Sequence, residues 1–184
     1  MDTTLLVVLI AAVVIAAIGV WMYLRTHRTK TLRSRFGPEY ERAVHQYGDR
    51  THAERELETR AKRADQYHIR SLNQDEQHQF SDQWHGTQAR FVDDPPLAIR
   101  EADHLVCEVM RARGYPMTDF DRRAEDLSAS HPAVVRNYRA AHEIATQQEQ
   151  GRATTEDLRK AMVYYRDLFD ELLEAQPAGS LGRR

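Results

Sequence analysis

The sequence predicts an all-α protein with one N-terminal transmembrane helix, a charged juxtamembrane helix and a small antiparallel helical bundle. Residues 5–24 form an uncharged apolar run, which is typical of a membrane-spanning helix. Residues 73–174 contain apolar side chains at helical spacing between capping residues. No sustained alternation of apolar and polar residues with tight-turn pairs is present in the sequence. These three observations favour helices throughout.

Residues 1–24 are interpreted as a membrane anchor. A helix over residues 5–24 would be about 30 Å long, which matches the hydrocarbon core of a bilayer. Leu5 and Leu24 bound the apolar run, and Trp21 and Tyr23 have the amphipathic rings found at membrane interfaces. A cleaved signal peptide is the alternative, because Ala-Ile-Gly at residues 17–19 is a loose cleavage site. Signal peptides have a basic start and a shorter apolar segment, so the anchor is favoured.

A basic collar follows the anchor at once and consists of Arg25, Arg28, Lys30, Arg33 and Arg35. The four residues before the apolar run contain one acid, Asp2, and no basic side chain. Positive charge beside a span favours the cytoplasmic side, which predicts an N-terminus outside and a cytoplasmic C-terminal domain. Residues 36–184 hold 21 basic and 27 acidic side chains. We therefore expect the collar to contact the lipid bilayer and its anionic headgroups, and no nucleic acid to be bound.

Residues 25–72 are expected to form the basic collar and charged stalk helices. Gly37 interrupts the juxtamembrane helix, Pro38 suits the first position of a short helix, and Gly48 ends that helix. Residues 51–68 are rich in charge, and their thin apolar stripe comprises Ala53, Leu57, Ala61 and Ala64. This pattern predicts a solvated stalk or a weak coiled-coil seam rather than a core helix.

The helical bundle is expected over residues 73–174 and begins with a capping box. Asn73 and Glu76 have the spacing at which two side chains satisfy each other's backbone N–H groups. The helix that they start reaches Phe91. Its apolar side comprises Phe80, Trp84, Thr87 and Phe91. Together these residues predict the first long helix of the bundle.

Two further helices follow from proline, glycine and cap signals. Asp94 is the expected N-cap and Pro95 the first residue of the second long helix, which Gly114 ends. Thr118 is expected to cap a short helix that runs to Leu127. The connections are short, which favours antiparallel neighbours.

The last two long helices complete the bundle. His131 and Pro132 start the third long helix, because the residue before a proline avoids the helical conformation. Thr154 and Asp157 resemble a capping box for the last helix. Its apolar stripe comprises Leu158, Ala161, Met162, Tyr165, Leu168, Phe169, Leu172 and Leu173. Residues 175–184 lack an apolar pattern and are expected to form a disordered tail.

The nine histidines are the side chains best suited to a metal-binding or catalytic site, and several lie three positions after a carboxylate. Glu101 and His104 have the Glu-x-x-His spacing of di-iron bundles. At about 100° per residue, however, His104 lies opposite the apolar stripe of its helix and Glu101 lies well off it. We therefore expect no metal and no cofactor. The single cysteine, Cys107, is expected to be a small buried apolar residue.

His142 differs from the other histidines because it lies at the border of an apolar stripe, which predicts a half-buried side chain. A histidine satisfied by a neighbouring carboxylate or carbonyl is the simpler interpretation. A ligand pocket formed by Tyr138, His142 and Tyr165 is the alternative. No nucleophile and base pair, Gly-rich phosphate loop or zinc-ligand spacing can be placed. We therefore expect no catalytic residues and no enzyme.

Several motifs also carry a resemblance to a known family. They are Arg90-Phe91-Val92-Asp93-Asp94-Pro95, Arg113-Gly114-Tyr115-Pro116, Asp126-Leu127-Ser128 with His131-Pro132, and Tyr138-Arg139-Ala140-Ala141-His142. With them, most of the chain resembles a family of uncharacterised bacterial proteins in which a single membrane span and a basic collar precede a helical domain. The resemblance implies a bacterial inner-membrane location, and because that family has no assigned activity it implies no catalytic residue.

Two classes of function are consistent with these features. The first is a membrane-tethered cytoplasmic interaction module whose helical domain binds a protein partner or packs as a homodimer. The second is a membrane-anchored ligand-binding or catalytic domain with a pocket near His142. An enclosed pocket with convergent polar groups at His142 would favour the second class, and a solid core would favour the first.

Overall fold

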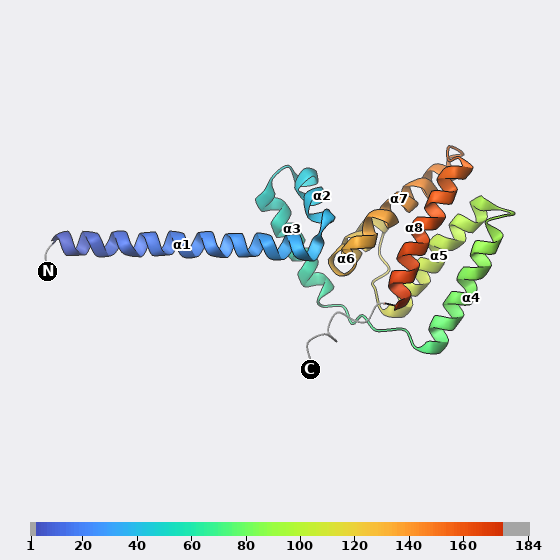
Figure 1. The fold of residues 1–184 in the computed structure, drawn as a ribbon, viewed down its shortest axis with the longest axis horizontal. Coiled ribbons are helices and arrows are strands. Elements are labelled where there is room, and N and C mark those ends of the chain that lie inside the picture. Colours follow the sequence, from blue (N-terminus) through green and yellow to red (C-terminus); the bar gives the residue numbers. More distant parts are fainter. Residues whose placement is uncertain (1–2, 175–184) are drawn as a thin grey trace. The chain divides into compact units, whose positions relative to one another are not determined.

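The computed structural model describes residues 3–174, with side chains from residue 10 onward, and over this range the chain forms eight α-helices and no strand (Figure 1). The predicted all-α class is therefore confirmed. The helices group into two compact units that divide between Leu57 and Glu58, inside helix α3 (Arg50–Ala64). The tail expected at residues 175–184 lies outside the described residues.

The first unit begins with α1 (Thr3–Phe36), a single helix of 34 residues. At about 1.5 Å per residue it is roughly 50 Å long, so the helix continues well beyond the apolar run and carries the whole collar. Gly37, with φ of +50°, ends it, and Pro38 begins α2 (Pro38–Tyr47) at the predicted position. Gly48, with φ of +67°, ends α2 in the left-handed conformation that favours glycine.

Helix α3 is not the solvated stalk that the sequence predicts. Ala53 and Leu57 are fully buried, and the other two members of its apolar stripe are each 8% exposed. Arg60 is only 3% exposed, and its Nη2 donates to Glu125 Oε1 at 2.9 Å. The acidic partner of Arg60 lies 65 residues further along the chain. A charged side chain can be buried when it has such a partner. The local charge pattern of α3 therefore does not show that the helix is buried.

The second unit is built from four long helices that lie side by side with one short helix against them (Figure 1). The long helices are α4 (Gln74–Arg90), α5 (Pro95–Arg113), α7 (Pro132–Glu149) and α8 (Thr155–Glu174), and the short helix is α6 (Phe120–Ser130). Helix α5 packs against α4 and α8, α8 packs against α7, and α7 packs against α6. The predicted helical bundle is therefore present.

The core of the second unit is centred on α8. Seven of the eight apolar residues predicted for the buried stripe of α8 are buried, and Leu173 is half-buried. Trp84 of α4 stacks on Phe169 of α8 with ring centroids 4.7 Å apart. The burial of these large side chains supplies the main stabilisation of the bundle.

The helix caps follow the sequence signals with one correction. Asn73 and Glu76 form the predicted capping box, and the Asp94 side chain accepts a hydrogen bond from the Leu97 backbone N–H. The N-cap of α6 is Asp119 rather than Thr118, and the helix runs to Ser130 instead of ending at residue 127. Aspartate is a strong N-cap, and its charge also complements the positive end of the helix dipole.

The second unit includes residues that precede the expected start of the bundle at residue 73. Arg63 Nε donates to Asp126 Oδ1 at 2.7 Å, and the Tyr67 hydroxyl donates to Asp126 Oδ2 at 2.9 Å. Leu72 is 6% exposed and belongs to the apolar core. The compact unit therefore starts at Glu58.

The end of α5 is fixed by close packing of the chain before α4. Arg113 is 1% exposed and donates to the backbone carbonyls of Leu172 at 2.6 Å and Arg70 at 3.2 Å. Gly114 follows with φ of +94°, and a Cβ there would lie 2.8 Å from the His68 carbonyl oxygen. The predicted helix stop is therefore also a position where only glycine fits without movement of the backbone.

Candidate functional site

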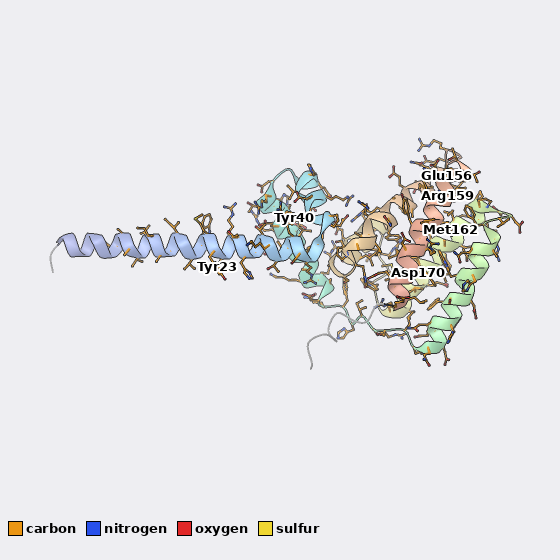
Figure 2. All side chains as sticks on the ribbon, in the orientation of Figure 1. Tyr23, Tyr40, Glu156, Arg159, Met162 and Asp170 are labelled. Atoms are coloured by element: carbon orange, nitrogen blue, oxygen red, sulfur yellow. The ribbon has the colours of Figure 1, made fainter. Side chains whose placement is uncertain are left out.

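The first candidate site is the uncovered apolar surface of α1. Within residues 3–174, α1 is the one helix long and apolar enough to cross a membrane. Its large apolar side chains are 49–70% exposed, and they are Ile10, Val13, Val14, Ile15, Ile18, Val20, Trp21, Met22, Tyr23 and Leu24. Figure 2 shows Tyr23 projecting from this helix. The side chain of Leu5 lies outside the described side chains. A continuous exposed apolar surface of this kind marks a membrane or protein contact.

The collar extends α1 as a continuous helix. Four of its five side chains are exposed, and Arg35 is half-buried. The guanidinium carbon of Arg25 lies 5.3 Å from the centre of the Trp21 ring, a cation–π arrangement. The helix therefore carries a cation directly beside the aromatic residue that the sequence assigns to the membrane interface.

Arg33 is engaged within the first unit. Its guanidinium carbon lies 5.0 Å from the centre of the Tyr40 ring, and its Nη2 donates to Glu41 Oε1 at 2.8 Å. Both members of the ion pair are 57% exposed, so the pair itself adds little to stability. Arg33 thus links the collar to α2, a role that its position in a charge run does not reveal.

A buried carboxylate joins the three helices of the first unit, and the sequence analysis missed it. Glu54 of α3 is 5% exposed. Its Oε1 accepts hydrogen bonds from Thr29 Oγ1 of α1 at 2.7 Å, from the Tyr40 hydroxyl of α2 at 2.8 Å and from Arg50 Nε at 3.1 Å. We call these four residues the Glu54 cluster; Figure 2 labels Tyr40. The cluster fixes the end of α1 to α2 and α3.

The Glu54 cluster keeps its carboxylate ionised. Burial by itself would raise the pKa of Glu54, but hydrogen bonds from Thr29, Tyr40 and Arg50 outweigh it and hold the pKa below its ordinary value. Burial, and then the hydrogen bond to Glu54, raises the pKa of Tyr40. At neutral pH the cluster therefore pairs an anionic carboxylate with a neutral phenol and a cationic guanidinium. The sequence feature that could have indicated this cluster is the position of Glu54 next to Ala53 in the apolar stripe of α3.

Tyr138, His142 and Tyr165 lie close together, but aromatic rings fill the space between them. Tyr138 and Tyr165 are fully buried, with ring centroids 6.5 Å apart in an edge contact. His142 is half-buried and stacks on Phe120 with centroids 3.6 Å apart. Phe120 also contacts Tyr138 at 4.9 Å. Phe120 of α6, which the sequence analysis did not include in the pocket, is therefore the ring that joins His142 to Tyr138.

The polar atoms of these rings differ in their hydrogen bonding. The Tyr165 hydroxyl donates to Asp103 Oδ1 at 3.0 Å. Among the described residues, the Tyr138 hydroxyl and His142 Nδ1 are buried without a hydrogen bond of standard geometry, although the Arg123 guanidinium lies close enough to act on the pKa of Tyr138. Burial, followed by the electrostatic influence of Cys107 and Asp103, raises the pKa of Tyr138. Both tyrosines therefore remain neutral hydrogen-bond donors rather than bases.

A second polar chain, also missed from the sequence, joins a loop, α7 and α8. His131 Nδ1 lies 2.8 Å from Glu171 Oε1, and His131 Nε2 lies 3.0 Å from the Tyr115 hydroxyl. A neutral ring satisfies both contacts when Nδ1–H donates to the carboxylate and Nε2 accepts from the phenol. Burial lowers the pKa of His131, and the hydrogen bond to Glu171 offsets this only in part.

The order of groups in this chain, hydroxyl to imidazole to carboxylate, is that of an activated nucleophile. Tyr115 and His131 are only 4% and 8% exposed, however. A substrate would have no access to the hydroxyl in this conformation. These hydrogen-bonded side chains therefore connect the loop before α6, the start of α7 and the end of α8.

The carboxylate and histidine pairs on helix surfaces lie apart from one another. Glu101 forms an ion pair with Arg90 of α4, and His104 Nε2 lies 3.4 Å from Glu108 on its own helix. Among residues 3–174, no group of three or more histidine, cysteine or acidic side chains is placed to hold a metal ion.

A hollow of about 470 Å³ lies between α4 and α5, near the turn that joins them. Its lining includes the buried residues Thr87 and Leu105 and the exposed residues Arg100 and His104. A second hollow of about 300 Å³ continues from it and shares Gln83 and Glu108. This face has no signal in the sequence, because its lining combines polar and apolar positions from two different helices.

Comparison of the chain with models of known families, with curated proteins and with solved structures finds no match. The function is therefore inferred from the geometry of the chain itself.

Proposed function

We propose that the protein is a membrane-tethered interaction module. In this proposal α1 crosses a bacterial inner membrane once, with the N-terminus outside, and the remaining helices lie in the cytoplasm and bind a protein partner. The observation that carries the proposal is the exposure of the apolar side chains of α1, at 49–70%, in a chain whose other large apolar side chains are almost all covered. Moving this surface into lipid is favourable by about 25 cal/mol per Å².

The collar supports the proposed orientation and a contact with lipid headgroups. Arg25 and Lys30 are exposed on the turns that follow the apolar surface. Basic side chains at this position are attracted to anionic lipids by about 1 kcal/mol each. The bacterial inner membrane is proposed on the family resemblance of the motifs.

An interaction role is favoured over catalysis by the way the second unit is filled. The rings of Phe120 and Tyr165 each pack against Tyr138, and Tyr115 and His131 are buried. Among the described residues, open surface features of this unit include the α4–α5 hollow and the turn beside it. Small-molecule sites bury most of the ligand's surface, whereas these features are open, which favours a protein contact.

Membrane fractionation tests the anchor. The full-length protein should remain in the membrane pellet after alkaline carbonate extraction, and mass spectrometry should find it uncleaved. Replacing Val13, Val14 and Ile18 with Asp should release it, because each charge at the centre of a span costs about 2.5–3.5 kcal/mol. As a matched control, replacing the same residues with Leu should leave it in the pellet. Cleavage near Gly19, or full extraction of the unaltered protein, would contradict the proposal.

The alternative function is a ligand site near His142. It is favoured by His142 Nδ1, which is buried without a hydrogen-bond partner among the described residues, because such an atom is costly unless something satisfies it. Native mass spectrometry of the detergent-solubilised protein separates the two functions. A stoichiometric small molecule that is lost in His142→Gln would establish the ligand site, whereas an empty protein that binds a protein partner would support the module.

A further inference from the structure

We propose that the turn between α4 and α5 docks into the α4–α5 hollow of a second copy of this chain. The inference rests on the proposed function and names the partner of the interaction module. Val92 lies in this turn and is 83% exposed. Outside α1, Val92 is the only strongly exposed large apolar side chain in the part of the chain whose side chains are described. A single exposed apolar residue is common on protein surfaces, so Val92 indicates a contact only together with the hollow and the charged side chains beside it.

The hollow beside the turn can receive an apolar side chain. Thr87 and Leu105 are buried in its lining, and Gly86 lines it with no side chain of its own. A Cβ at Gly86 would meet no atom within 4 Å, so the space in front of this glycine is open. A valine side chain is far smaller than a hollow of about 470 Å³, which therefore also has room for the residues that flank Val92.

Charge complements shape at the same two places. Asp93 follows Val92 in the turn, and Arg100 lines the hollow. In residues 3–174 the structure gives neither side chain an intramolecular ion pair or hydrogen bond, although nearby Arg90 pairs with Glu101 and Asp94 caps α5. The hollow is lined by two arginines and two glutamates, so its charge is balanced. Arg90 pairs with Glu101, and Glu108 lies 3.4 Å from His104, which leaves Arg100 as the unpaired cation among these lining residues that can face Asp93. Insertion of Val92 would bring the unpaired carboxylate close to the unpaired guanidinium.

A second copy fits this arrangement because the turn and the hollow lie on one helical hairpin. A two-fold axis between them places each turn at the hollow of the other copy, so every contact is made twice. The contact is smaller than the roughly 1,600 Å² of a standard interface. Two copies held in one membrane meet at a raised effective concentration, which permits a weak contact to be populated.

Crosslinking in intact membranes tests the contact directly. Two copies of the full chain carry different tags, and Cys107→Ser removes the native cysteine from both. One copy has Val92→Cys and the other has His104→Cys. His104 lines the hollow, and its side chain is 71% exposed. A short bismaleimide should join the two tags. Asp75→Cys, at the far end of α4, is the matched control and should give at most a tenth of that product.

Charge reversal tests the pairing independently of crosslinking yield. Asp93→Arg and Arg100→Asp should each weaken association about tenfold, because each variant places like charges together twice in the dimer. Mixing the two variants pairs each reversed residue with its opposite in the other copy, and association should return. Both positions are exposed, so the fold is retained, which circular dichroism can check.

Two results would overturn the inference. One is that Val92→Cys crosslinks to a different protein, or that no product joins the two tagged copies, while the protein remains in the membrane pellet. The other is a failure of the mixed variants to associate better than either variant alone. In both cases retention in the pellet shows that the anchor holds, and loss of the unaltered protein from the pellet identifies failure of the proposed function instead.

Discussion

Two buried titratable residues, Glu54 and His131, connect segments of the chain that local pattern cannot connect. Each would destabilise the fold if it were buried alone, because an unsatisfied polar group costs about 1–3 kcal/mol. Glu54 accepts hydrogen bonds from α1, α2 and its own helix. His131 lies between Tyr115 and Glu171. In both cases hydrogen bonds turn that cost into a fixed arrangement of helices.

Removing the Glu54 carboxylate should loosen the first unit. Glu54→Ala leaves the hydroxyls of Thr29 and Tyr40 without their acceptor, and we expect a cost of about 2–4 kcal/mol. In hydrogen-exchange mass spectrometry of the solubilised full-length protein, α2 and the start of α3 should lose protection. Glu56→Ala is the matched control, because Glu56 is half-buried on the same helix. Equal protection in the two variants would show that the cluster does not hold the unit together.

His131 should make the second unit sensitive to mild acid. Its pKa is below the ordinary value in the folded state, so the neutral ring is the form that the fold favours. Its contribution is complete above the unfolded pKa of about 6.5 and is lost as the pH falls through the folded pKa. The charged groups that act on it are Glu171, which favours protonation, and Arg113, which opposes it.

Urea unfolding at pH 7.5, 6.0 and 5.0 measures this effect. In a fragment of residues 58–174, Trp84 is the single tryptophan and reports on the core. The free energy of unfolding should fall between pH 7.5 and 5.0. His131→Gln should be less stable at pH 7.5 but should show a flatter dependence in this window. If its slope matches that of the unaltered fragment, another group is responsible.

At the scale of helices, bounds set by local chemistry are predictable and burial set by distant partners is not. The start of α5 at Pro95 and its stop at Gly114 follow from residues next to each other in sequence. The burial of helix α3 does not follow from its sequence, because Arg60 is buried against Glu125, which lies 65 residues further along the chain. A sparse apolar stripe looks solvated when the residues that cover it cannot be identified.

The candidate site divides in the same way. The exposed surface of α1 is predictable because it depends on the composition of one uninterrupted segment. The proximity of Tyr138 and Tyr165 follows from two apolar stripes that must face a common core. Phe120 was not foreseen beside His142, since it comes from the short helix α6. Hydrogen-bonded chains that draw on three segments, such as the Glu54 cluster, have no periodic signal.

The buried face of helix α8 should contribute more to the free energy of unfolding of the second unit than its partly exposed face. Leu168 is fully buried, and Leu168→Ala should cost about 2–5 kcal/mol through lost burial and a residual cavity. Leu173→Ala is the matched control on the same helix, where the side chain is half-buried and the cost should be clearly smaller. Chemical denaturation of the 58–174 fragment measures both, and equal costs would show that α8 does not pack as described.

At the scale of the whole molecule, the second unit should fold without the first. Residues 58–174 contain the apolar core together with Arg63 and Tyr67, which hydrogen-bond to Asp126. A fragment of residues 73–174 lacks these contacts and the buried Leu72. We expect both to be helical by circular dichroism and the longer fragment to unfold at higher urea concentration. A longer fragment that is no more stable would place the start of the domain at residue 73.

The orientation in the membrane should depend on the collar, because its five basic side chains are the strongest charge asymmetry across the span. A reporter active only in the cytoplasm, fused after Arg184, should be active, and a reporter that requires the periplasm should not. Replacing all five collar residues with Gln should give a mixture of orientations. Replacing Arg159 and Lys160 with Gln is the control and should change nothing, since charges far from a span contribute little. An orientation that stays fixed without the collar would mean that translocation is decided by the folded helices behind it, and reversed reporters on the unaltered chain would place those helices outside the cytoplasm.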